Sequence, residues 1–100
     1  MAWKNFTHTL AGATAEAISA VSAKAKSVRI QPRRTNSHVL YVGGSSVTSS
    51  NGYELNFPAN AAANLDHVDL DDYSGNGMDL ASIYVIGTAG ETVQGIYEEF

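Results

Sequence analysis

The chain contains no cysteine, only two prolines and no lysine or arginine after residue 34. The lack of cysteine excludes disulfides, thiolate zinc sites and thiol nucleophiles. No stretch approaches the roughly 20 apolar residues that a membrane helix needs, and the first residues hold no apolar run of signal-peptide length. The sequence therefore predicts a protein made in the cytoplasm, without a membrane partner.

Charge is divided unevenly along the chain. The part before residue 35 holds all six basic residues and a net charge of +5, whereas the remainder carries nine acids and a net charge of −9. Such a division can favour head-to-tail contacts between copies. We favour the alternative, in which distant strands come together in one fold and the charges mix on its surface.

Period-two alternation predicts an all-β fold. In residues 27–31, Val28 and Ile30 point to one side and Arg29 to the other, and Pro32 ends this strand or places it at an edge. Further strands are expected at 38–42, 53–57, 64–70, 82–86 and 92–97, with turns at 33–37, 43–52, 71–77 and 88–91. This spacing predicts one domain over residues 1–100, an antiparallel β-sandwich similar to a jelly roll.

Two details of the strand arrangement can be predicted as well. The runs 38–42 and 82–86 are apolar on both faces, so both should be central strands. The similar segments 40–45 and 83–88 are interpreted as equivalent strands in the two halves of the sandwich. The strands at 82–86 and 92–97 are expected to form a hairpin.

The alanine-rich segment 10–26 is ambiguous. Its composition favours a helix, but Ile18 and Val21 are too few to form a broad buried stripe. The alternation in 14–19 fits a strand, which we favour because the rest of the chain is β. Residues 1–26 are therefore part of the sandwich, a helix or an N-terminal arm.

No residues are expected to be catalytic or to hold a metal or cofactor, and the protein is predicted not to be an enzyme. The three histidines lie far apart, and no nucleophile-elbow or phosphate-binding motif occurs. Residues 72–77 resemble the start of a calcium loop, but Ile83 stands where the bidentate acid should be. We favour a solvated polar loop, with weak calcium binding as the alternative, and a surface-binding role is considered for Asp71, Asp72, Tyr73, Asn76 and Asp79.

The basic cluster and the terminal aromatics are candidates for contacts. The basic residues are Lys24, Lys26, Arg29, Arg33 and Arg34. The overall acidity argues against nucleic acid, which leaves solvated charges or a salt-bridging contact to an acidic neighbour. Trp3, Phe6 and Phe100 either fold back onto the domain or anchor it to a partner.

Several segments resemble small virion proteins of tailed bacteriophages. They are 27–32, 35–36, 41–53 and 83–90, and the resemblance spans roughly residues 27–97. It implies a compact sandwich that decorates or cements a capsid, often as a trimer, with no catalytic residues. The alanine-rich N-terminal third and the loop 71–79 depart from the pattern.

Two functions follow as expectations. The first is a capsid decoration protein, located in the virion, that binds the major capsid protein or another virion protein and stabilises the assembled head. It would be a homo-oligomer, with a trimer favoured, and its assembly contacts would be Trp3, Phe6, Arg33, Arg34 and Phe100. The alternative is a carbohydrate- or cell-surface-binding module of a phage fibre or tail, using Tyr41, Tyr53, Tyr73 and Tyr84 and the loop 71–79.

Overall fold

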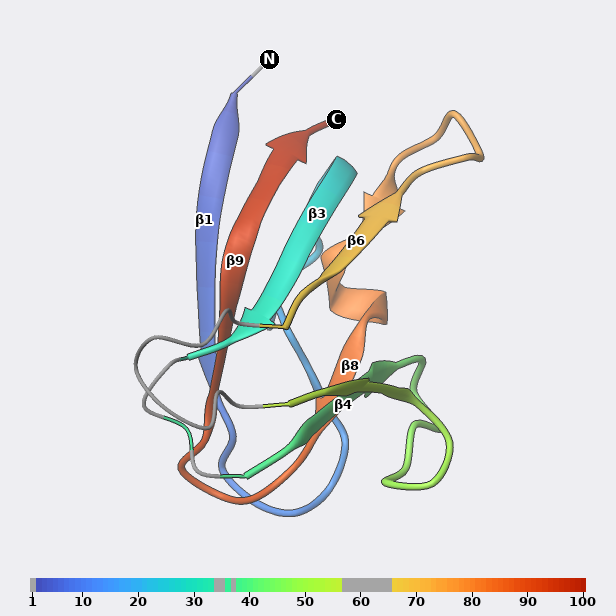
Figure 1. Cartoon of the computed structure of the whole chain (residues 1–100). Coiled ribbons are helices and arrows are strands. Elements are labelled where there is room, and N and C mark those ends of the chain that lie inside the picture. The colour runs from blue at the N-terminus through green and yellow to red at the C-terminus, as the bar shows by residue number, and fades with distance from the viewer. Residues whose placement is uncertain (1, 34–35, 37, 57–65) are drawn as a thin grey trace.

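Two antiparallel β-sheets make up the protein, seen in a computed structural model that describes residues 2–33, 36, 38–56 and 66–100 (Figure 1). The large sheet has the order β1-β9-β3-β6, with β7 also paired to β3. Its strands are β1 (Trp3–Thr9), β9 (Thr92–Glu99), β3 (Lys24–Pro32), β6 (Val68–Asp71) and β7 (Met78–Asp79). The small sheet has the order β2-β8-β4-β5. Its strands are β2 (Glu16–Ala17), β8 (Tyr84–Ile86), β4 (Leu40–Gly43) and β5 (Tyr53–Leu55).

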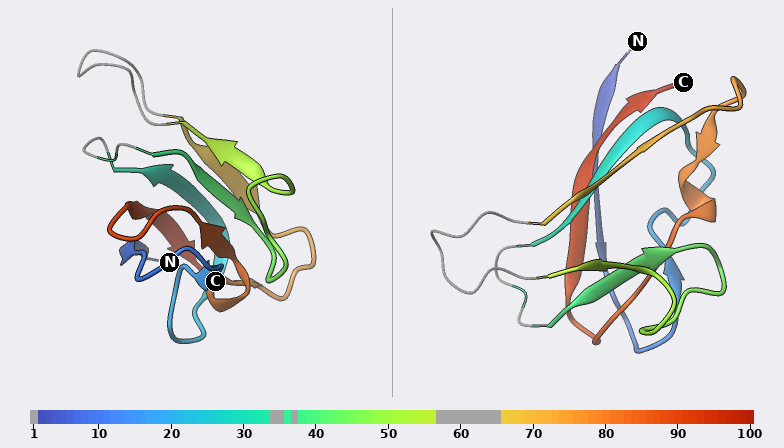
Figure 2. Two further views of the ribbon diagram at one scale, coloured as in Figure 1. Left: turned by 90° about the horizontal axis from the view of Figure 1, so that it is seen from below. Right: turned by 45° about the vertical axis from the view of Figure 1, so that its right-hand side comes forward.

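The fold is an all-β sandwich, as the alternation predicts. Strands β4 and β5 run across the direction of β1 and β9, which the right-hand view of Figure 2 shows clearly. A single 3-10 turn, η1 (Leu80–Ser82), leads into β8. No helix among the described residues is long and apolar enough to cross a membrane.

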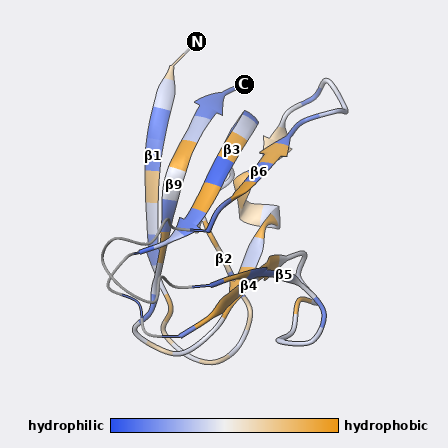
Figure 3. Ribbon diagram, in the orientation of Figure 1, coloured by the Kyte–Doolittle hydropathy of each residue, from blue (hydrophilic) through white to orange (hydrophobic). Residues whose placement is uncertain are grey.

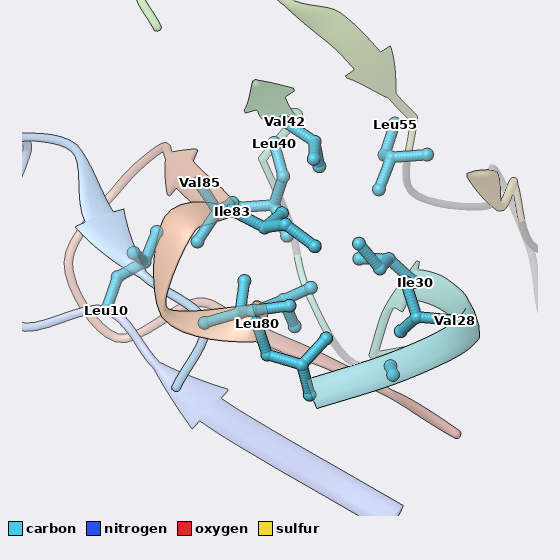
Figure 4. Packing of buried hydrophobic residues seen from close by; sticks show 12 residues of the cluster. Leu10, Val28, Ile30, Leu40, Val42, Leu55, Leu80, Ile83 and Val85 are labelled. Atoms are coloured by element: carbon cyan, nitrogen blue, oxygen red, sulfur yellow. The ribbon is translucent and has the colours of Figure 1, made fainter. Parts of the chain in front are cut away.

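One apolar core lies between the sheets. Val28 and Ile30 of β3 face Leu40, Val42 and Val85 of the small sheet (Figure 4). Leu80 and Leu10 close the core from the connecting segments, and all of these side chains are buried. Burying a side chain of this size contributes about 1.5–3 kcal/mol, so the alternation in β3 fixes which face of the large sheet points outward. Figure 3 shows this alternation as apolar and polar bands along the strand.

The strand at 27–31 is confirmed and is longer than predicted. It ends at Pro32, which pairs with Val93, and the turn after it is closed by the Asn36 N–H, which donates to the Arg33 carbonyl at 2.9 Å. The strands at 38–42, 53–57 and 82–86 appear as the shorter β4, β5 and β8. Ser82 lies in η1 instead, while Phe57 and residues 64–65 fall outside the described residues.

The expected hairpin between 82–86 and 92–97 is wrong. Strand β8 belongs to the small sheet and β9 to the large sheet, so the turn at 88–91 carries the chain from one layer to the other. The Glu91 N–H donates to the Thr88 carbonyl at 3.1 Å, which confirms a turn. Alternation and turn chemistry are the same for a hairpin and for such a crossing, which is why the sequence did not separate them.

The interpretation of segments 40–45 and 83–88 also needs correction. Strands β4 and β8 are both central, as predicted, but they pair with each other inside the small sheet instead of occupying different sheets. The register sets Val42 opposite Val85, and both side chains point into the core. Two similar sequences therefore form one apolar strand pair.

The N-terminal third is neither a helix nor an arm. Residues 3–9 form β1, and within 10–26 the chain makes the two-residue β2, connecting loops and the start of β3. The preference for strands is thus confirmed in a reduced form, since the predicted 14–19 shrinks to Glu16–Ala17. A carboxylate stabilises this loop: Glu16 accepts hydrogen bonds from the main-chain N–H groups of Ala11 and Gly12 at 3.0 and 3.1 Å.

The two oppositely charged parts of the chain interleave. Basic strand β3 lies between β9 and β6 of the acidic part, and Arg29 forms an ion pair with Asp69 at 2.7 Å. Lys4 of β1 reaches Glu99 of β9 at 3.1 Å. The favoured expectation, that charges from both parts mix on one surface, is therefore confirmed.

Candidate interaction surface

The face of the large sheet that points away from the core is an ordered array of mostly polar side chains. The register aligns its residues in rows across four strands. The first row is Trp3, Glu98, Ser27 and Asp71, the second is Asn5, Ile96, Arg29 and Asp69, and the third is Thr7, Gln94 and Gln31. We call these eleven residues the outer face.

A groove crosses the outer face. One hollow of about 590 Å³ lies between Trp3 of β1 and Asp69 and Asp71 of β6. A second hollow of about 330 Å³ continues along Asn5, Thr7, Gln31 and Gln94. Arg29 and Ile96 line both hollows, so the two are parts of one groove. Its walls stand three strand spacings apart, about 14 Å.

The floor of the groove is organised by one ion pair. The Arg29 Nε and Nη2 atoms donate to the two Asp69 carboxylate oxygens at 2.7 and 2.9 Å, the two-pronged geometry that best fixes both groups. The hydrogen bond from Arg29 lowers the pKa of the Asp69 carboxyl and raises that of the guanidinium. Both side chains remain half exposed, so they keep further donor and acceptor capacity toward a ligand.

The amides on the outer face are available for contacts. Within the described residues, the side chains of Asn5, Thr7 and Gln31 take part in no hydrogen bond, and Gln94 accepts only one, from Arg33 at 3.3 Å. Amide groups both donate and accept hydrogen bonds. The groove therefore offers an exposed tryptophan, a fixed ion pair, the three uncommitted side chains of Asn5, Thr7 and Gln31, and the remaining hydrogen-bonding capacity of Gln94.

Two exposed aromatic side chains lie at the end of the large sheet where both chain termini meet (Figure 1). They are Trp3 and Phe100, with exposed fractions of 59 and 53%. The two termini are joined there by the Glu99 N–H, which donates to the Ala2 carbonyl at 2.9 Å. The Phe100 N–H donates to the Lys24 carbonyl of β3 at 3.2 Å. We call Trp3 and Phe100 the terminal aromatics.

The five predicted assembly contacts do not share one surface. Trp3 and Phe100 lie together, but Arg33 follows β3 at the opposite end of the sheet, where its N–H donates to the Thr92 carbonyl at 3.0 Å. Phe6 packs against the core beneath β9, and Arg34 lies outside the described residues. The structure thus groups two of the five and separates the others.

The loop between β6 and β7 is closed by its own first carboxylate. Asp72 accepts hydrogen bonds from the Ser74 hydroxyl at 2.7 Å and from the Gly77 N–H at 2.8 Å. The Ser74 hydroxyl bond is the main cause of the lowered Asp72 pKa. N–H and O–H donors therefore point at the oxygens that a calcium ion would need, which fits the solvated-loop interpretation. Tyr73 and Asn76 are exposed at the tip, and Asp71 belongs to the groove.

Asp79 has a structural role instead. Its carboxylate accepts hydrogen bonds from the Ser22 hydroxyl at 2.8 Å and from the N–H groups of Ala81 at 3.0 Å and Ala23 at 3.2 Å. The bond from Ser22 is the main cause of its lowered pKa. Asp79 therefore begins η1 and ties it to the segment before β3. The five residues of the predicted surface loop therefore differ in their surroundings. Asp71 lines the groove, Asp72 closes the loop, Tyr73 and Asn76 are exposed at its tip, and Asp79 caps η1.

The histidines lie in separate places. His8 contacts Glu16 at 2.9 Å, and His38 contacts Glu91, which is 53 residues further along the chain, at 2.7 Å. His67 precedes β6, 3.7 Å from Asp69. In the part of the chain that the structure describes, no three His, Asp or Glu side chains are grouped so as to hold a metal ion.

Fold and surface together define the class: a small antiparallel β-sandwich with an open polar face that carries an exposed tryptophan. The chain matches no protein-family model, and no curated protein or solved structure is significantly similar to it.

Sequence reasoning missed the groove, although it identified Trp3, Arg29 and Asp71 individually. Residues of the outer face come from four strands that are not consecutive in the chain. The alternation of Arg29 and Gln31 opposite Val28 and Ile30 signals an outward polar row, but which strands flank β3 is a matter of tertiary pairing.

Proposed function

We propose that the chain is a structural protein of a tailed-bacteriophage virion, one that acts by binding other virion proteins and not as an enzyme. The partner is the major capsid protein or another component of the particle, and binding to the assembled lattice stabilises the head by mass action. The proposal starts from the resemblance of segments 27–32, 41–53 and 83–90 to such proteins.

The observation that carries the proposal is the gathering of the terminal aromatics. Trp3 and Phe100 are exposed at the end of the large sheet where the two chain termini lie side by side. Large aromatic side chains are the most frequent anchors of protein–protein interfaces, because they bury much area at little entropic cost. An exposed pair of this kind is suited to anchor the domain to a lattice.

A co-sedimentation experiment with the matching empty heads tests the proposal. The purified protein should pellet with assembled heads, fail to bind free capsid subunits, and raise the melting temperature of the shell. Absence of the protein from purified particles, together with no binding to heads, would refute a virion role.

A second function is favoured by a specific observation, the groove. A sugar hydroxyl both donates and accepts hydrogen bonds, and the groove presents amides and an ion pair around an exposed tryptophan. Small-molecule sites commonly combine an aromatic wall with a few placed polar groups. One basic and three acidic side chains on the outer face disfavour polyanions, so an uncharged oligosaccharide fits best.

The structure changes which residues would carry this second function. Tyr41, Tyr53 and Tyr84 lie on the small sheet, whereas Tyr73 lies in the β6–β7 loop of the large sheet, so the four tyrosines are divided between the two layers. A glycan array with and without calcium tests the alternative. Binding that Trp3→Ala abolishes and Tyr73→Ala leaves intact supports the groove, whereas no bound glycan removes this function and leaves the capsid role untouched.

A further inference from the structure

Strand β1 has a long edge that no other strand of the described residues covers. It is the first strand of the large sheet, and it pairs with β9 over seven consecutive residues without a bulge. At the ends of this ladder, Glu99 donates to Ala2 and Leu10 donates to Glu91, both at 2.9 Å. Antiparallel alternation then directs even-numbered residues toward β9. The N–H and C=O groups of Trp3, Asn5, Thr7 and Thr9 therefore point outward.

This edge lacks the features that usually prevent strand pairing. Natural edge strands are kept short, or carry charges, prolines or bulges. The other edges fit that rule: β2 has two residues, β5 has three, and β6 has four with two aspartates. Strand β1 has no proline, and Lys4 is neutralised by its ion pair with Glu99.

A hollow lined by both apolar and polar side chains lies along the same edge. It has a volume of about 340 Å³ and is lined by residues of β1 and of segment 18–23, including Phe6, Ile18 and Val21. Val21 is 70% exposed. An open strand edge and an uncovered hollow thus occur side by side, and a single partner that extends the sheet would cover both.

We propose that β1 pairs in an antiparallel manner with β1 of a second copy of the chain, about a two-fold axis at Phe6. In this register, Asn5 of each copy pairs with Thr7 of the other, and Trp3 pairs with Thr9. All four are outward-pointing residues, so each pair exchanges two main-chain hydrogen bonds. The two large sheets become one continuous sheet.

The side chains favour a second copy over an unrelated strand. In this register, polar Asn5 of one copy lies opposite polar Thr7 of the other on the outer side of the sheet. The two Phe6 side chains lie opposite each other at the axis, and such aromatic pairs stabilise antiparallel strands. Phe6 already lines the hollow, so the second copy brings an apolar side chain to the place that needs one. No two unpaired like charges face each other.

This inference is independent of the proposed function and specifies an even-numbered assembly, unlike the trimer that the sequence resemblance implies. Light scattering over a dilution series measures the mass of the full chain. The expected mass is twice 10.6 kDa at high concentration, falling toward the monomer on dilution. A trimer, or a monomer at every concentration, would overturn the proposal.

A proline substitution separates pairing from folding. The Thr7 N–H points to the open edge, so Thr7→Pro removes a donor to the second copy but none to β9. We expect this variant to be monomeric with an unchanged β circular-dichroism spectrum. The matched variant Thr7→Val keeps the N–H and should remain dimeric. A Thr7→Pro variant that folds and stays dimeric would overturn the proposal.

Cross-linking tests the register even if the proline variant does not fold. Since the chain has no cysteine, Asn5→Cys and Thr7→Cys variants can be mixed and oxidised. Their Cα atoms would be about 5.5 Å apart, within disulfide range. Either variant alone would pair across more than about 7 Å, which disfavours a bridge. Cross-linking of the mixture well above either variant alone supports the register, and equal or weaker cross-linking contradicts it.

Discussion

Gly95 of β9 lies directly against the main chain of Arg29 on β3. A Cβ atom at Gly95 would overlap the Arg29 carbonyl oxygen and would come within 2.7 Å of the Phe6 ring. Three neighbouring strands of the large sheet lie side by side here. Gly95 of β9 pairs with Phe6 of β1 on one side and with Ile30 of β3 on the other. The close approach of β1, β9 and β3 depends on the missing side chain.

Gly95→Ala should therefore lower the free energy of unfolding by about 3 kcal/mol or more, because the clash is with main chain and cannot be relieved by a rotamer change. Chemical denaturation measures the loss. Gly44→Ala is the control, since a Cβ there meets nothing within 4 Å, and it should change stability by less than about 0.5 kcal/mol. Equal effects of the two substitutions would contradict the packing argument.

The Asn36 side chain hydrogen-bonds the main chain of Thr92, as a neighbouring strand would. Its side-chain Nδ2 donates to the Thr92 carbonyl at 2.8 Å, and its Oδ1 accepts from the Thr92 N–H at 3.0 Å. Both groups are buried, so Asn36→Ala should cost about 2–3 kcal/mol and speed hydrogen exchange at the Thr92 amide. Asn76→Ala, at an exposed loop tip, should leave both unchanged. Slow exchange at Thr92 in the Asn36 variant would show that the amide has another partner.

Glu16 should make stability depend on acid pH. Burial raises the pKa of its carboxyl, but the hydrogen bonds from His8, Gly12 and Ala11 outweigh burial, so the folded pKa lies below the ordinary 4.5. The stabilisation is therefore complete above pH 4.5 and is lost as the pH falls through the folded-state pKa.

Glu16→Gln should be less stable than the wild type near neutral pH, by about 1–3 kcal/mol, and should lose less stability on acidification. Denaturation curves at a series of pH values measure this difference. An identical acid dependence in both proteins would mean that Glu16 does not contribute to it.

The terminal aromatics should carry head binding. Trp3→Ala and Phe100→Ala are each expected to weaken binding to empty heads by at least about tenfold, the usual effect of truncating an aromatic anchor. Tyr53→Ala is the matched control, because Tyr53 is 55% exposed but lies on the small sheet. If Tyr53→Ala alone weakens binding, the lattice contact lies on the other layer.

Calcium should have no effect on the β6–β7 loop. The Asp72 oxygens already accept hydrogen bonds from Ser74 and Gly77, so a cation would have to displace them. Melting curves with calcium and with a chelator are expected to coincide. A calcium-dependent rise in melting temperature that Asp72→Asn removes would contradict this.

The parts of the fold that sequence could predict are those governed by local alternation. Val28 and Ile30 identify β3 and its buried face, and the apolar runs around Val42 and Val85 identify the two central strands. Strand β1 was missed because Phe6 is the only large apolar side chain on its inner face. That strand is stabilised by the main-chain ladder with β9, which sequence does not show.

The candidate surface was less predictable than the fold. Trp3, Arg29 and Asp69 line one groove only because the strand order is β1-β9-β3-β6. This strand order depends on long-range pairing, which the sequence does not show. The same limitation produced the incorrect hairpin, since a turn at Thr88–Glu91 does not reveal which sheet the next strand joins.

The hydrogen bond between Glu99 and Ala2 has a practical consequence for anyone who joins another polypeptide to this protein. A fusion at either end emerges at the same pole, two residues or fewer from Trp3 or Phe100, and would crowd the surface under test. A peptide tag inserted at Ser49–Ser50, in the exposed β4–β5 loop of the other sheet, would leave that pole clear. A circularly permuted chain, opened in that loop and joined by a short linker between the original ends, should fold into the same sandwich.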